Sequence, residues 1–468
     1  MLIWNGKYGG IADSKYSGVE GAFAESVGID GHSTPGLLKV HQKLSLDSGA
    51  TVDAFVKVAL AASNGYTFWF SSTSGKIFAR TPGGVWSLAY TTSPTSGGAG
   101  CLGKREFNGY IYWATQSYLH RIAIADADDS WANVVPNWDL FEVTDALFHP
   151  MEEQDLSLFT GDGNQVHKVT ASGVTNRNVL DIKTPHRISA LKAYDIDLLL
   201  GTFIHERVQK AEIVRWDTVD TSWQTSDEIE EAGINAFLMD ENYVLVQAGL
   251  TGNWYLFNGE QLIPYKTIPG VYVDGNNATQ SVKVHEGSVG KFLGRPIFGV
   301  SNVNGNAAKQ GVYTFGSYSK DYPKVMDLSW VISQNKTESV ETGAIIVSNF
   351  ELLVAWKDGT NYGVDKIDWS NKYGNAYMET MMLPDRNRIK VIGEAVGYYA
   401  TLKTSGIRFS ARTNHGDWLS LTSITNSARN GVQAKLSIPK ASAIQMRINP
   451  LVSGNDGPEI EAIEVNFR

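Results

Sequence analysis

A short motif that recurs seven times constrains the fold of this chain more than any other feature of its sequence. Each copy is a polar turn followed by a strand of apolar and aromatic residues, as at 64–70, which read NGYTFWF. A period of roughly 40–50 residues with several short strands per repeat is typical of a β-propeller, whose four-stranded blades stack around an axis. The copies begin at Asn64, Asn108, Gln154, Tyr194, Glu241, Leu293 and Ser348, at steps of 44, 46, 40, 47, 52 and 55 residues.

The residues around each copy fit the strands of a blade. A second strand begins 10 to 19 residues after the start of each copy, and some copies also follow an apolar strand, such as 234–238. Inner blade strands are buried on both faces, which explains continuous apolar runs such as that at 198–200. We therefore predict an all-β protein with a β-propeller of about seven blades over residues 51–383. Six or eight blades, or a multi-sheet β-sandwich with chance spacing, are the alternatives.

The two ends of the chain do not follow the repeat. Residues 1–50 form a lead-in arm, in which the stretch 38–44 is expected to complete the last blade and close the ring, because closure removes a free sheet edge. Within residues 384–468, apolar residues fall at every second position in the stretches 407–412 and 443–448, for example at Ile444 and Met446. This alternation predicts a C-terminal β-sandwich with one buried face per sheet. Its strands are expected near 389–403, 405–412, 417–422, 431–438, 442–449 and 459–467.

Charge is distributed unevenly along the chain. The net charge is −9, yet the stretch from Arg386 to the C-terminus holds 11 Lys and Arg against 6 Asp and Glu, so it carries +5 and the remainder −14. A nucleic-acid binder usually has a strongly basic domain. We therefore expect no specific nucleic-acid binding, and the split favours contact between subunits of opposite charge.

The cellular compartment is inferred from two further features. Cys101 is the one cysteine of the sequence, so the chain cannot form an internal disulfide, which argues against a disulfide-built secreted module. The N-terminus lacks the pattern of a signal peptide, and no apolar run reaches about 18 residues. We expect a chain made in the cytoplasm, with no membrane span, in which Cys101 fills a small apolar space.

Reactive side chains are scattered and form no catalytic or metal-binding motif. Glycoside cleavage needs two carboxylates at a set distance across a pocket, and no spacing singles out such a pair. No two histidines have metal-site spacing, and one cysteine cannot build a thiolate site. We therefore predict that the chain is not an enzyme and has no catalytic, cofactor-binding or metal-binding residues and no cofactor. The carboxylates beside the repeat strands are Asp195, Asp197, Asp240, Glu351 and Asp365, and the histidines are His32, His41, His120, His149, His167, His186, His205, His285 and His415.

Two short segments are similar to calcium loops. They are Gly161–Asn164 and Lys357–Asn361, and each supplies fewer oxygens than the six or more that calcium takes. We interpret both as hairpin turns.

The lead-in arm resembles a known group of proteins. Residues 9–14 read GGIADS, residues 28–40 read GIDGHSTPGLLKV, and the propeller repeats follow. This arrangement is similar to the N-terminal part of bacteriophage virion proteins of the nozzle or distal-tail kind, in which a short arm precedes a β-propeller body. The resemblance covers under a tenth of the chain. It implies a homo-oligomer, because such proteins build rings or collars.

The function expected from these features is a non-enzymatic structural component of a bacteriophage virion, a tail protein that assembles in the host cytoplasm. Its partners would be other copies of itself and neighbouring virion proteins. The acidic runs at 126–129 and 227–231 would be solvated loops or would face basic residues of a neighbour. The alternative is a carbohydrate- or receptor-binding propeller, such as a lectin-like tail tip protein that binds a host-surface glycan. A polysaccharide-degrading enzyme is a third hypothesis.

Overall fold

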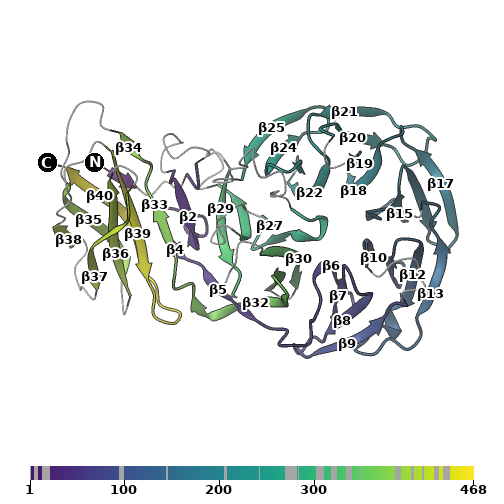
Figure 1. Ribbon diagram of the computed structural model, residues 1–468, viewed down its shortest axis with the longest axis horizontal. Coiled ribbons are helices and arrows are strands. Elements are labelled where there is room, and N and C mark those ends of the chain that lie inside the picture. The colour runs from purple at the N-terminus through teal and green to yellow at the C-terminus, as the bar shows by residue number, and fades with distance from the viewer. Residues whose placement is uncertain are drawn as a thin grey trace.

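Strands dominate the structure, which joins a ring of blades to a smaller sandwich (Figure 1). The described part of the chain contains two helical turns, η1 (Ile124–Asp126) and η2 (Glu286–Ser288), and no helix in it is long and apolar enough to cross a membrane. This computed structural model describes the chain except residues 1, 5–8, 13–21, 94–99, 144–145, 205–207, 242, 269–281, 283, 302–309, 318–323, 334–339, 349, 385–391, 402–404, 414–415, 426–431, 436–442 and 468.

Five four-stranded antiparallel sheets follow one another along the chain, each running outward from the axis as a meander. The first two comprise β6 (Val56–Ala61), β7 (Thr67–Ser71), β8 (Lys76–Arg80) and β9 (Trp86–Thr91), then β10 (Gly103–Phe107), β11 (Tyr110–Ala114), β12 (Tyr118–Ala123) and β13 (Val135–Leu140). The third and fourth comprise β14 (Met151–Gln154), β15 (Ser157–Asp162), β16 (Gln165–Thr170) and β17 (Thr175–Asp181), then β18 (Arg187–Tyr194), β19 (Asp197–Phe203), β20 (Ala211–Trp216) and β21 (Thr225–Ile229). The fifth comprises β22 (Ile234–Asp240), β23 (Tyr243–Ala248), β24 (Asn253–Phe257) and β25 (Leu262–Thr267).

Two further units complete the ring. One is the meander of β26 (Val289–Phe292), β27 (Arg295–Val300), β28 (Gly311–Gly316) and β29 (Val325–Val331). The other consists of β30 (Glu341–Ser348), β31 (Glu351–Asp358), β32 (Asn361–Lys372) and the N-terminal β5 (Gln42–Leu46). The innermost strands β6, β10, β14, β18, β22, β26 and β30 contact one another in this order, and β30 contacts β6.

The blade count differs slightly from the prediction of about seven. Six blades are separate four-stranded sheets, whereas β26–β29 belong to a ten-stranded sheet that continues into the sandwich. The physical reason is that the outermost strand β29 is not a free edge. It pairs in parallel with β2 (Glu25–Val27), where Val27 lies opposite Leu328.

The repeat motif of the sequence marks the hairpin between the first and second strand of every unit. The turn residues have positive φ, for example Asn108 (47°) and Gly109 (79°) between β10 and β11. The second predicted strand of each copy is the third strand of its unit, as for β8 and β12. The prediction of a propeller is therefore confirmed by topology as well as by strand content.

The ring is closed by a strand from the N-terminal arm, which is Gln42–Leu46 and not the predicted stretch 38–44, because residues 39 and 40 pair with β3 instead. β5 pairs with β32, and Leu44 lies opposite Ile367 in this register. The outermost strand of the last blade thus comes from the other end of the chain, which leaves no break between the first and last blades.

Two sheets form the sandwich, and both chain ends lie there (Figure 1). The strands predicted for the C-terminal region are found within a few residues of their expected bounds. The boundary near residue 384 is wrong, because strands before it already pair with β39. One sheet orders β1 (Leu2–Trp4), β40 (Glu459–Phe467), β35 (Ile392–Thr401) and β38 (Val432–Lys435). The other continues from β2 through β33 (Tyr377–Glu379), β39 (Ala443–Leu451), β36 (Gly406–Thr413) and β37 (Leu419–Thr425), with β34 (Leu383–Pro384) beside β39.

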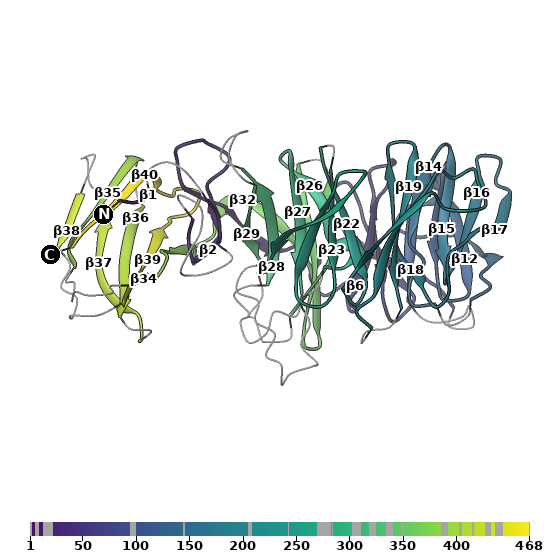
Figure 2. The same cartoon turned by 90° about the horizontal axis from the view of Figure 1, so that it is seen from above.

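The first strand of the lead-in arm, β1, pairs with β40 in the sandwich, and the arm then lies between the two bodies (Figure 2). It forms β2, then the two-stranded sheet of β3 (Ile29–Asp30) and β4 (Lys39–Val40), then β5. His32 of the intervening turn contacts Asp327 of β29 at 2.7 Å, and both side chains are buried. The arm is therefore an integral part of both the propeller and the sandwich.

The apolar cores lie between successive blades. In β19, Leu198 and Leu200 pack with residues of the preceding blade, whereas Leu199 packs with residues of the following one. All three side chains are fully buried. This alternation explains the continuous apolar run in the sequence, because each face of a blade contacts a neighbour.

Candidate functional site

The innermost strands enclose a cavity of about 170 Å³ around the axis of the ring. Its walls come from the innermost strands of all seven units and from η2. The lining residues are Val58, Ala59, Gly103, Lys104, Arg105, Met151, Glu152, Leu191, Lys192, Phe237, Glu286, Gly287, Val289 and Ile345.

Two glycines let the inner strands approach closely around this cavity. A Cβ atom on Gly103 would lie 1.7 Å from the carbonyl oxygen of His149, and one on Gly287 would lie 2.1 Å from that of Lys57. Both distances are far below van der Waals contact. Any side chain at these two positions would push the neighbouring blades apart, so the width of the axial cavity depends on the two glycines.

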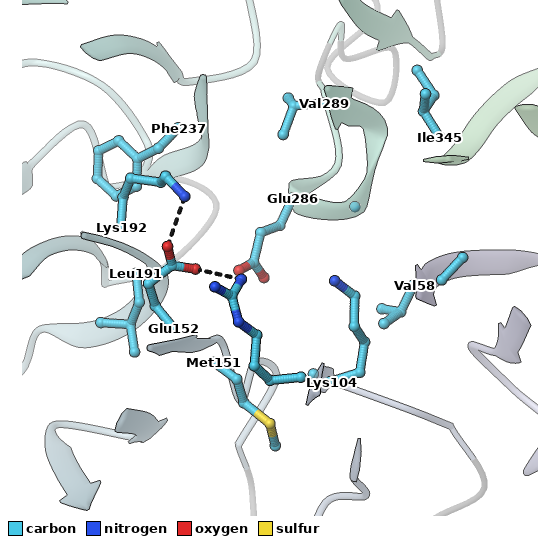
Figure 3. A pocket seen from close by; sticks show the side chains of 14 residues that line it. Val58, Lys104, Met151, Glu152, Leu191, Lys192, Phe237, Glu286, Val289 and Ile345 are labelled. Carbon is cyan, nitrogen blue, oxygen red and sulfur yellow. Dashed lines mark hydrogen bonds and ion pairs between the residues drawn. The ribbon is translucent and has the colours of Figure 1, made fainter. Parts of the chain in front are cut away.

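Charged side chains from four different segments converge in the cavity (Figure 3). Glu152 of β14 accepts hydrogen bonds from Arg105 of β10 at 3.0 Å and from Lys192 of β18 at 2.7 Å. Lys104 and Glu286 extend into the same space, and in the described part of the chain neither has an oppositely charged partner within 4.0 Å. Three cations therefore share the cavity with two carboxylates.

Burial shifts the protonation equilibria of Glu286 and Lys104 in opposite directions. Desolvation raises the pKa of Glu286 to about 7, against the opposing attraction of Lys104. Desolvation and the neighbouring Arg105 lower the pKa of Lys104. A carboxyl group that titrates near neutral pH beside desolvated cations can exchange a proton at physiological pH, and such groups cluster at functional sites.

None of the five carboxylates considered from the sequence lines the axial cavity. Asp195 lies exposed in the turn between β18 and β19. Four others have partners in or near their own blades: Asp197 pairs with Arg215, Asp240 with Lys324, Glu351 with Arg80, and Asp365 accepts a hydrogen bond from Trp356. The structure does not bring any two of them together.

Most of the histidines considered as metal ligands from the sequence are buried and hydrogen-bonded within the blades. His120 stacks on Trp113, with ring centroids 5.1 Å apart, and His149 Nδ1 lies 2.8 Å from the carbonyl oxygen of Gly161. No cluster of three or more potential metal ligands occurs among the residues that the structure describes. The further contacts of the set are His32 to Asp327, His41 to Trp330, His167 to Asp162, His186 to Glu212 and His285 to Glu341, while His205 and His415 lie outside the described residues.

The two segments that are similar to calcium loops are hairpin turns in the structure, as expected from the sequence. Gly161–Asn164 joins β15 to β16, and Lys357–Asn361 joins β31 to β32. The acidic runs are only partly loops. Asp128 and Asp129 are exposed between β12 and β13, but the second run begins within β21, and Glu231 is buried and accepts hydrogen bonds from Asn253 and Tyr255.

The functional residues expected from the sequence did not include four charged residues of the axial cavity, Lys104, Glu152, Lys192 and Glu286. A signal for the first three is present, because each lies two to four residues before a repeat marker, in a strand that should be apolar. These three side chains line the axial cavity, whereas Glu106, two residues before its marker, accepts a hydrogen bond from the backbone N–H of Ser63 instead. Glu286 precedes its unit in a helical turn, and the repeat gives no indication of it.

A second polar concavity, of about 440 Å³, lies on the outer face of the sandwich sheet. Ile407 and Phe409 of β36 point into the core, which leaves the intervening Arg408 exposed on this face. Tyr377 and Trp418 line the concavity with Arg408 and Arg447.

Arg447 is held at the centre of this face. Its guanidinium lies 4.7 Å from the ring centre of Tyr377 and 4.3 Å from that of Trp418. Arg412 also covers Trp418, at 4.6 Å, and both arginines pair with Glu379. Arg408, Arg412 and Arg447 outnumber the carboxylates Glu379 and Glu25, the second of which accepts a hydrogen bond from Tyr377, so the face has an excess of positive charge.

The single cysteine is expected to be unreactive in the folded protein. Cys101 belongs to the core between the first two blades, and its thiol contacts the carbonyl oxygen of Gly103 at 3.2 Å. Burial raises the pKa of the thiol to about 12, so almost no thiolate exists at neutral pH. We expect Ellman's reagent to modify Cys101 only after unfolding by denaturant. Rapid labelling of the native protein at pH 8 would contradict this placement.

Comparison with known proteins shows a similarity of fold to solved structures. No protein-family model and no curated protein sequence matches the chain. One similar solved structure is the extracellular domain of a hybrid two-component system from B. thetaiotaomicron, at 12% identity and a TM-score of 0.48; the match covers 83% of this chain and 48% of that one, so this chain spans about half its length. Another is virginiamycin B lyase from Staphylococcus aureus, at 8% identity and a TM-score of 0.46, with 70% of this chain and 98% of that chain covered. At such identities these likenesses concern the β-propeller fold alone.

Proposed function

We propose that this chain is a non-enzymatic structural component of a bacteriophage virion, a tail protein that acts by assembling with copies of itself and with neighbouring virion proteins. The observation that carries the proposal is the place of the lead-in arm, the segment that resembles phage virion proteins. Ile11 and Val27 pack in the core around β26–β29, while Phe23 and Ile29 pack in the sandwich core. An arm that joins two bodies through both cores suits a rigid building block.

Charge complementarity supports assembly between copies. The positive face around Arg408 and Arg447 lies on the sandwich, whereas exposed Asp128 and Asp129 follow β12 at the opposite end of the molecule (Figure 1). A contact between different surfaces of two identical copies is heterologous, and it generates a ring when the rotation closes. Opposite potentials on the two surfaces favour this orientation over others.

Charge reversal tests the proposed contact. We expect the wild-type protein to form oligomers in analytical ultracentrifugation at about 0.1 M salt and to dissociate toward monomers at about 1 M, where the Debye length falls from about 10 to about 3 Å. Arg408→Glu should prevent assembly at low salt. Mixing it with an Asp128→Lys/Asp129→Lys protein should restore hetero-oligomers, because the reversed charges attract again.

A matched control and a particle assay complete the test. Lys291→Glu reverses another exposed charge, on the propeller strand β26, and should leave assembly unchanged. Antibodies raised against the protein should bind intact phage particles from the parent culture. A monomer at every salt concentration that is also absent from particles would contradict the proposal. Binding to a glycan array that is lost on Trp418→Ala would favour the carbohydrate-binding alternative.

A further inference from the structure

The axial cavity has features of a binding site that the assembly proposal does not require. A cavity of roughly 150 Å³ can admit a ligand of about six non-hydrogen atoms, and the axial cavity measures about 170 Å³. Its walls are polar where Lys104, Arg105, Glu152, Lys192 and Glu286 meet. A site of this size and polarity fits a small charged molecule.

The balance of charge in the cavity indicates the sign of that molecule. Glu152 is already engaged by Arg105 and Lys192, which leaves one positive charge in excess within this triad. Lys104 adds a second, which ionised Glu286 offsets and protonated Glu286 does not, and among the described residues no carboxylate lies within 4.0 Å of it. Cations removed from bulk water are costly unless an anion compensates them.

We propose that the axial cavity binds a small oxyanion of the sulfate, phosphate or carboxylate class. Lys104 and Arg105 hold this anion, and its oxygen atoms accept a hydrogen bond from the protonated carboxyl group of Glu286. Charge-assisted hydrogen bonds from lysine and arginine suit the oxygen atoms of such anions. Glu286 lies across the cavity from Lys104 (Figure 3), so an anion placed between them contacts both. Ionised Glu286 repels the anion, and binding is therefore coupled to a proton.

Other charged groups near Glu286 enter the same equilibrium. His285, the preceding residue, lies 3.7 Å from Glu341 of β30. On the β6 side, Lys57 contacts the ring of Phe55. The remaining charges that act on Glu286 are Lys104, Glu152, Lys192 and Arg105. His285 is the histidine next to Glu286 in the sequence, so its variant is needed as a control.

Sulfate is the probe that tests the site, because its charge does not change between pH 6 and 8. We expect isothermal titration calorimetry to detect one sulfate per chain at pH 6. Binding should weaken about tenfold by pH 8, following the loss of the Glu286 proton, whose pKa is about 7. Lys104→Met should weaken binding at pH 6 by about tenfold or more, as expected for one charge-assisted hydrogen bond.

Three variants separate the proposal from general salt effects. Glu286→Gln keeps a hydrogen-bond donor and should bind sulfate equally at pH 6 and 8. His285→Gln should retain the pH dependence of the wild type. Lys76→Met, which removes a cation paired with Asp53 far from the axis, should bind as the wild type does.

Two results would overturn the inference. One is the absence of a binding heat for sulfate, together with equal stabilisation of the wild type and Lys104→Met against heat, which would show surface exclusion of the salt only. The other is a pH dependence that persists in Glu286→Gln. Because sulfate binding is measured on the single chain, either result leaves the assembly proposal untouched.

Discussion

Replacing Leu44 by alanine is expected to lower the free energy of unfolding by about 2–5 kcal/mol, the range for buried leucines in well-packed cores. Leu44 lies on β5, the strand that closes the ring, and it is 3% exposed. Its core includes Ile367 of its own blade and Trp330 of the neighbouring unit. The substitution therefore weakens both the last blade and its contact with β26–β29. The measurement is urea unfolding followed by circular dichroism.

Lys43→Ala is the matched control for this prediction. Lys43 precedes Leu44 on the same strand, its side chain is 41% exposed, and its ion pair with Asp368 spans 3.6 Å. Exposed pairs of this kind contribute at most about 1 kcal/mol. If both variants unfold at the same urea concentration as the wild type, β5 does not contribute to the stability of the ring.

Acid is expected to destabilise the protein between about pH 6.5 and pH 4 through His41 and His120. Desolvation lowers the pKa of each imidazole from 6.5 to about 4. In this range the unfolded chain binds the protons and the folded chain does not, so stability falls as the pH falls. One pKa unit corresponds to about 1.4 kcal/mol, which gives a loss of up to about 3 kcal/mol for each histidine at pH 4.

Glu286 acts in the opposite direction over part of this range. Its pKa rises from 4.5 to about 7 in the folded protein, so its contribution to stability is present below pH 4.5 and is lost as the pH rises toward 7. The contribution of a single histidine must therefore be measured as a difference between two proteins.

His41→Gln isolates that contribution. The difference in unfolding free energy between the wild type and this variant should shrink by about 3 kcal/mol from pH 7 to pH 4, as measured by urea titration at each pH. Gln42→Ala alters the adjacent residue without removing a titrating group, and its difference from the wild type should stay constant. A constant difference for His41→Gln as well would mean that His41 is protonated normally in the fold.

Local patterns in the sequence were sufficient to predict the strands of the sandwich and the hairpins of the propeller. Met446 and Ile448 lie on either side of the partly exposed Arg447 because a sandwich strand has one buried face, and both are buried in the structure. The repeat markers predicted the hairpins because tight turns favour residues that accept positive φ, such as Asn108 and Gly109.

The candidate site could not be predicted in the same way. The carboxylates considered from the sequence lie beside the repeat strands, and the structure places them in three blades, with none of them lining the axial cavity. Of the charges that do converge, Lys104, Glu152 and Lys192 stand shortly before repeat markers, whereas the repeat gives no indication of Glu286. Their common feature is a position facing the axis, which exists only once the blades are arranged as a ring.

The sequence by itself determined that this protein is a β-propeller with a sandwich and a closing N-terminal strand, because turn residues and burial patterns act within a few neighbouring positions. The tertiary structure alone decided that β2 joins the propeller to the sandwich, with Val27 between Leu328 and Tyr377. It also decided which charges meet on the axis. Both depend on pairing between segments that lie far apart in the chain. Such pairing produces no periodic pattern of residues in either segment, so the local sequence does not predict it.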